Sequence, residues 1–155
     1  MYATSNINTT MNKNATANVN PNINAKMNYQ IVKIFNDIFF KFVDLISNTF
    51  PHDLDITIAK NKLYAIKKLN PKMIIKIWRL HITEKYKDSI EAGDIDFFIE
   101  KNYNEDLNKM QNSERIMNCV NKLREPIKRM ERNKQELTMK FIQDLTKVSQ
   151  MIQLN

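Results

Sequence analysis

The side chains best suited to chemistry in this chain are its one cysteine and its two histidines. Cys119 stands between Met117 and Val120 in a helical pattern, and a thiol among apolar neighbours is more typical of buried structure than of a nucleophile. His52, His81 and Cys119 would together supply three zinc ligands, but no two of them share the short spacing of a zinc site. The sequence therefore predicts neither a metal centre nor a catalytic residue.

An acidic stretch, Asp94–Asp106, invites comparison with a calcium-binding loop. Its acids match the first, third and twelfth positions of such a loop, beginning at Asp94. Phe98 and Ile99, however, occupy positions that require an oxygen ligand and a glycine. We therefore expect Asp94 to cap a short helix, Ile95–Glu100, and not to bind calcium.

The scarcity of glycine excludes several families of nucleotide-binding loops. Gly93 is the only glycine, whereas loops that hold phosphates or dinucleotides need several. No motif indicates a cofactor or a small-molecule substrate. The sequence therefore predicts a protein that is not an enzyme.

The elements that would position these residues are organised around Asn70–Gly93. Asn70 is suited to cap a helix, Pro71 to fill its first position, and Gly93 to end it in a left-handed conformation. The apolar stripe between these signals is wide, so we expect this helix to be packed on more than one side and to form the centre of the fold. The stripe comprises Met73, Ile74, Ile75, Ile77, Trp78, Leu80, His81 and Ile82.

Two further helices are predicted before it, Asn28–Asn48 and Asp53–Leu69, separated by Pro51. Three antiparallel helices with short links, followed by the short helix after Gly93, would form a compact all-α bundle. In the first helix the inward residues are Ile31, Ile34, Phe35, Ile38, Phe39, Phe42, Leu45 and Ile46. In the second they are Ile56, Ala59, Leu63, Ile66 and Leu69.

The last third of the chain carries a heptad pattern, typical of long helices packed by knobs into holes. Pro126 interrupts it, and because the pattern keeps its phase we expect two helices nearly in line there, with a single bent helix as the alternative. The partner of this seam is either the bundle or a second chain, and a polar seam residue favours self-association. The seam positions are Ile116, Val120, Leu123, Ile127, Met130, Lys134, Leu137 and Phe141, continuing through Asp144, Val148 and Met151.

Composition predicts the domain organisation and the compartment. Residues 1–28 are rich in asparagine and poor in large apolar side chains, so we expect a disordered tail. Residues 29–155 would form one all-helical domain, with a bundle over 29–107 and the C-terminal helical segment over 108–155. A lone cysteine fits a reducing compartment, and no apolar run is long enough to span a bilayer. We therefore expect an intracellular protein, neither secreted nor membrane-spanning.

The formal net charge of +7 raises nucleic-acid binding as an alternative function. A basic ridge on the C-terminal helices would be able to follow a phosphate backbone. Acidic residues are interleaved with it, however, as on an ordinary solvated helix face. The ridge comprises Arg124, Lys128 and Arg132 at helical spacing, with Lys122, Arg129 and Lys140 nearby.

Three segments, the first beginning at Phe42 and the last ending at Met151, resemble known sequences: FVDLISNTFPHDLD, NPKMIIKIWRLHITEKYKDSIEAGDIDFFIEKNYNEDL and MKFIQDLTKVSQM. They are similar to small all-helical proteins encoded by nucleocytoplasmic large DNA viruses, or giant viruses. The resemblance implies a setting in the host cytoplasm or the virion, and it carries no activity and no functional residue. We therefore expect a structural or interaction protein that assembles with itself or with another viral protein.

Overall fold

A computed structural model describes residues 20–100 and 111–154, and every regular element within them is helical. The predicted all-α bundle is therefore confirmed for the described residues. A π-helical turn, Arg79–Thr83, joins α3 to α4 in one continuous helix, and a 3-10 turn, Glu125–Arg129, lies between α6 and α7. The α-helices are α1 (Pro21–Thr49), α2 (Leu54–Leu69), α3 (Met73–Trp78), α4 (Glu84–Glu91), α5 (Ile95–Glu100), α6 (Gln111–Arg124) and α7 (Arg132–Ser149).

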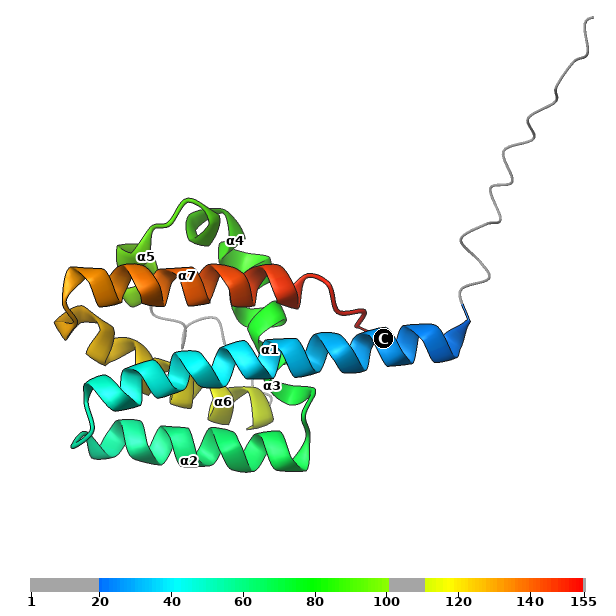
Figure 1. The fold of residues 1–155 in the computed structure, drawn as a ribbon, viewed down its shortest axis with the longest axis horizontal. Helices are drawn as coiled ribbons and strands as arrows, with labels where there is room; N and C mark the ends of the chain where they lie inside the picture. Colours follow the sequence, from blue (N-terminus) through cyan, green and yellow to red (C-terminus); the bar gives the residue numbers. More distant parts are fainter. Residues whose placement is uncertain (1–19, 101–110, 155) are drawn as a thin grey trace, which may run out of the picture.

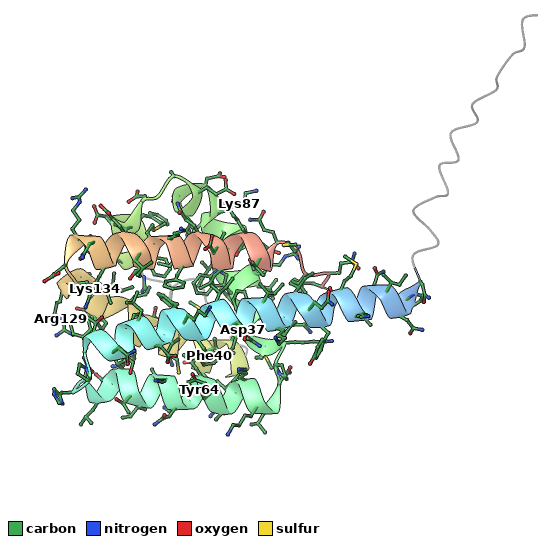
Figure 2. All side chains as sticks on the ribbon, viewed as in Figure 1. Asp37, Phe40, Tyr64, Lys87, Arg129 and Lys134 are labelled. Carbon is green, nitrogen blue, oxygen red and sulfur yellow. The ribbon has the colours of Figure 1, made fainter. Side chains whose placement is uncertain are left out.

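The helix that begins with α3 lies at the centre of the bundle, as its wide apolar stripe predicted. α3 contacts α1, α2, α6 and α7. Figure 1 shows α1 and α7 side by side and running in opposite directions, with α2 along the other side of α1. In Figure 2 the rings of Phe40 and Tyr64 meet between α1 and α2, with their centroids 4.2 Å apart.

An aromatic cluster around Trp78 forms the core. Trp78 is 1% exposed, and its ring centroid lies 6.1 Å from that of Phe35 and 6.2 Å from that of Phe39, both nearly edge-on. The ring of Phe98 in α5 lies 6.4 Å away. The indole Nε1 donates to the hydroxyl of Thr146 in α7 at 3.3 Å, which satisfies the one polar atom of this side chain. One residue thereby joins α1, α5 and α7 to the central helix.

The predicted end of the central helix is confirmed at Gly93. Its φ of 75° is left-handed, its N–H donates to Ile90 O at 2.9 Å, and the N–H of Asp94 donates to Ser89 O at 3.1 Å. These two bonds are those of the Schellman motif. The Asp94 carboxylate then accepts from the N–H of Phe97 at 3.0 Å, so it caps α5 as expected.

The first helix begins at Pro21, earlier than the predicted start at Asn28. The Asn20 side chain accepts from the N–H of Asn22 at 3.0 Å, and Pro21 occupies the first turn. This is the Asn-Pro start signal that also precedes the central helix. The expectation of disorder is therefore wrong for residues 21–27, and residues 1–19 lie outside the described part of the chain.

The helices on either side of Pro126 are not in line. α6 ends at Arg124, the 3-10 turn follows, and α7 runs back in the opposite direction (Figure 1). Met130 and Glu131 are extended, with ψ of 151° and 152°, and these two residues let the chain reverse without a glycine. The expectation of nearly collinear helices is therefore wrong.

The buried face of α7 is rotated away from the predicted seam. Leu137 is 45% exposed and Met151 is 63% exposed. The buried face includes hydroxyl side chains that are satisfied by hydrogen bonds within the protein, for example Thr138 Oγ1 to Lys134 O at 2.8 Å. A heptad pattern based on apolar residues leaves out such threonines and serines, so it misplaced the buried face. The buried residues are Thr138, Met139, Ile142, Leu145, Thr146 and Ser149.

Two of the residues expected to point inward from the first two helices are also on the surface. Ile34 in α1 is 50% exposed and Leu69 in α2 is 87% exposed. The other apolar positions predicted for these helices are buried or half-buried.

Phe39→Ala should lower the free energy of unfolding by about 3–5 kcal/mol, because it removes the ring between Phe35 and Trp78 and leaves a cavity. Tyr29→Ala is the matched control in the same helix, where the side chain is 69% exposed, and should change it by less than about 0.5 kcal/mol. Urea unfolding followed by circular dichroism measures both. Equal effects would contradict the packing described.

Candidate functional site

Partly exposed apolar side chains lie on the outer sides of α1 and α7 where these two helices pack against each other, and we call the line between them the apolar crease. Ile34 and Leu137 are about half exposed, at 50% and 45%, and the other members are half-buried. Large apolar side chains gathered in this way on a surface commonly mark an interaction site. We call this surface the α1/α7 face and define it by Ile34, Ile38, Leu45, Leu137, Phe141 and Val148.

Contacts at both ends of the crease fix which sides of the two helices meet. At one end the Lys134 ammonium donates to Thr49 Oγ1 at 3.5 Å, and Figure 2 shows Lys134 at that end of α7. At the other end Asn28 Nδ2 donates to Gln153 O at 3.4 Å, and Gln153 N–H donates to Asn28 Oδ1 at 3.3 Å. At 100° per residue, the seam side of α7 therefore faces α1, and Ile34 and Leu137 border the same crease.

The apolar band continues along α1 beyond the bundle. The N-terminal part of α1 projects past the end of α7 (Figure 1), and Ile23 and Met27 there are 52% and 53% exposed. Both lie on the same side of α1 as Ile34, since the three are separated by whole helical turns. The exposed apolar surface is thus longer than the crease itself.

Charges of opposite sign lie on the outer edges of the face. Lys41 is on the α1 edge and Asp144 is on the α7 edge, each at the helical position next to the apolar residues. Within the part of the chain that the structure describes, neither makes an ion pair. One positive and one negative charge without an ion-pair partner therefore lie beside the crease.

The structure divides the predicted seam into an inner and an outer half. The inner half is at most 7% exposed inside this chain and comprises Ile116, Val120, Leu123, Ile127 and Met130. The outer half lies on the α1/α7 face, with Lys134 bonded to Thr49, Leu137 exposed and Phe141 half-buried. Sequence reasoning found the α7 side of the face and assigned the α1 side to the core.

The predicted basic ridge is not continuous on the surface. Arg124 is 8% exposed, and its guanidinium donates to Phe98 O at 2.7 Å and to Asn121 Oδ1 at 2.8 Å. The 3-10 turn that follows also breaks the helical spacing on which the ridge depended. The other ridge residues are exposed, and four of them have a carboxylate nearby: Lys122–Asp55 at 3.7 Å, Lys128–Glu125 at 3.9 Å, Arg129–Asp53 at 3.4 Å and Arg132–Glu136 at 3.5 Å. Lys140 makes no ion pair with any residue that the structure describes.

The cysteine and the two histidines lie in different surroundings. Cys119 is 4% exposed, and burial raises the pKa of its thiol, while the charges of Lys62 and Arg115 partly oppose that rise. His52 is exposed in the turn before α2, and His81 is half-buried in the π-helical turn. Across residues 20–100 and 111–154, no group of three metal-ligating side chains is close enough to hold an ion.

Among the described helices, none combines the length and the apolar character that crossing a membrane requires.

Comparison of the chain with protein families, with characterised proteins and with solved structures finds no match. The resemblance to proteins of large DNA viruses therefore stays a prediction.

Arg124→Met should lower the free energy of unfolding by about 1–3 kcal/mol, because the buried carbonyl of Phe98 loses its charged donor. Arg132→Met, on an exposed position, should change it by less than about 0.5 kcal/mol. Thermal and urea unfolding of the two variants measure the difference. A stable Arg124→Met variant would show that this arginine is free to serve a surface function.

Cys119 should react slowly with iodoacetamide in the folded protein at neutral pH. The thiolate is the reactive form, and a raised pKa leaves less of it at any pH below that pKa. The rate should rise with pH and should reach that of an ordinary cysteine when the protein is unfolded in urea. Equal rates for folded and unfolded protein at neutral pH would contradict the burial of this thiol.

Proposed function

We propose that this protein is a helical interaction protein that associates with a second copy of itself through the α1/α7 face. The observation that carries the proposal is the outward-facing apolar crease, bordered by Ile34 on α1 and Leu137 on α7. Burying these side chains is the main source of free energy open to the folded chain on association.

The charges beside the crease favour a second copy as the occupant. A twofold axis that lies in the plane of the interface, midway between Lys41 and Asp144 and perpendicular to the line that joins them, brings each Lys41 over the Asp144 of the other copy. In a twofold interface each contact occurs twice, so both unmatched charges would be neutralised in both copies. Two pairs of helices would then pack face to face, as in a four-helix arrangement.

The magnitudes predict a reversible dimer. Burying the exposed half of a large apolar side chain contributes roughly 1 kcal/mol, so Ile34, Leu137 and Met151 with Ile23 and Met27 on two copies would contribute on the order of 10 kcal/mol. Association costs about 4–15 kcal/mol in lost translational and rotational freedom. The two terms are comparable and leave at best about 6 kcal/mol in favour of association, so the dimer should form only at about tens of micromolar protein or above.

Two alternative proposals name a different binding partner: another protein, or a nucleic acid. Another protein, in the viral setting that the resemblance implies, would use the same apolar face. Nucleic-acid binding rests on the net charge of +7 and on exposed residues such as Lys128 and Lys140. The burial of Arg124 removes the first residue of the series Arg124, Lys128 and Arg132, so charge alone supports this second function.

Leu137→Asp should raise the dissociation constant of the dimer by about tenfold or more, because it places a charge in the middle of the apolar contact. Arg132→Asp is the control, on an exposed position of the same helix about 140° around its axis from Leu137. Sedimentation equilibrium over a range of concentrations measures both. A dimer that tolerates Leu137→Asp as well as Arg132→Asp would remove this face from the interface.

Reversing the charges tests the geometry separately from the apolar contact. Lys41→Asp alone and Asp144→Lys alone should each weaken the dimer, since each brings like charges together. The double variant should recover much of the affinity, because each contact again joins opposite charges. If the double variant loses as much binding free energy as the two single variants lose together, the twofold pairing is wrong, even if the dimer forms through the crease.

A further inference from the structure

A second groove, independent of the α1/α7 face, lies between α2 and α6. It encloses a cavity of about 260 Å³ whose apolar wall includes Ile58 and Ala59 of α2. Ile58 is 50% exposed at its edge, although apolar side chains of this size are usually covered. The opposite wall is formed by α6, which packs along α2.

The charges that line this cavity are predominantly positive. Lys62, Arg115 and Lys122 face it together with Asp55 as the one acid. The ammonium of Lys122 lies 3.7 Å from the Asp55 carboxylate, so this pair closes one end of the groove. Lys62 and Arg115 make no ion pair within the part of the chain that the structure describes. Two cations on opposite helices therefore remain for an anion.

Cys119 lines the same cavity and is 4% exposed, and the charges of Lys62 and Arg115 partly oppose the rise in the pKa of its thiol that burial causes. Lys62 belongs to the α2 wall and Arg115 to the α6 wall. An anionic group in the cavity would therefore be open to charge-assisted contacts from both helices.

The groove continues into a second, more apolar cavity of about 190 Å³. The two cavities share Ile66 and Arg115, and the second is lined further by Leu69, Met73 and Ile116. Leu69 is 87% exposed at its rim. Arg115 thus stands where a charged compartment meets an apolar one.

We propose that the α2/α6 groove binds an amphipathic anion. A carboxylate or phosphate head lies between Lys62 and Arg115, and an apolar chain runs from it along Ile66 towards Leu69 and Met73. Charge complementarity selects the head, because both cations can donate charge-assisted hydrogen bonds to its oxygens. The apolar compartment selects the chain, as in other ligand sites with few polar groups and mostly apolar walls.

Isothermal titration of the full chain with octanoate, octyl phosphate, octyl glucoside and inorganic phosphate tests both halves of the ligand. Octanoate, octyl phosphate or both should bind more tightly than the uncharged glucoside and than phosphate alone, and the tighter of the two identifies the head. The bound anion should also slow alkylation of Cys119, because it would cover the thiol. Absence of binding by both anions overturns the proposal, as does equal binding of the glucoside.

Two surface variants and a matched control decide whether the groove is the site. Lys62→Glu and Arg115→Glu should each weaken anion binding by about tenfold or more, because each removes a charge-assisted contact. Lys68→Glu makes the same charge change on an exposed position of α2 outside the cavity and should leave binding almost unchanged. Urea unfolding checks that the variants remain folded. Equal affinities for all three variants would place the anion elsewhere and overturn the proposal.

Discussion

The burial of Trp78 is the interaction on which the rest of the structure depends. Its ring meets Phe35 and Phe39 of α1 and Phe98 of α5, and its Nε1 reaches Thr146 of α7. The π-helical turn that follows carries Thr83, whose hydroxyl lies 2.6 Å from that of Ser149. This polar contact fixes the rotation of α7 against the central helix, and the rotation turns Leu137 outward.

Both proposed sites follow from that arrangement. With the central helix enclosed, α1 and α7 bury one side of each helix and leave a shared apolar crease outside. α2 and α6 likewise pack along one side and leave Lys62 and Arg115 over a groove. Both proposals therefore concern surfaces of the bundle, where a partner or a ligand would cover exposed apolar side chains and neutralise unpaired charges.

The sequence predicted what local signals control, such as the Gly93 helix end, but not what packing decides. The Asn-Pro signal at Asn20 was outweighed by a polar composition, whereas Asn70 does not cap the central helix as predicted, because α3 begins at Met73 with Lys72 at its N-cap. Heptad spacing placed Leu137 and Phe141 on an interaction seam, yet it assigned Ile34 to the core, because apolar periodicity does not distinguish a buried position from a partly exposed one. No local pattern brings Lys62 and Arg115 together, since they lie on different helices.

The most direct test of self-association is chemical cross-linking between two singly substituted chains. One chain carries Lys41→Cys and the other Asp144→Cys, both with Cys119→Ser, and a short bis-maleimide joins thiols that lie close together. The twofold arrangement predicts a product in the mixture, and little product from either chain alone. Absence of a mixed product, or equally rapid coupling of Lys41→Cys chains to each other, would contradict the proposed assembly.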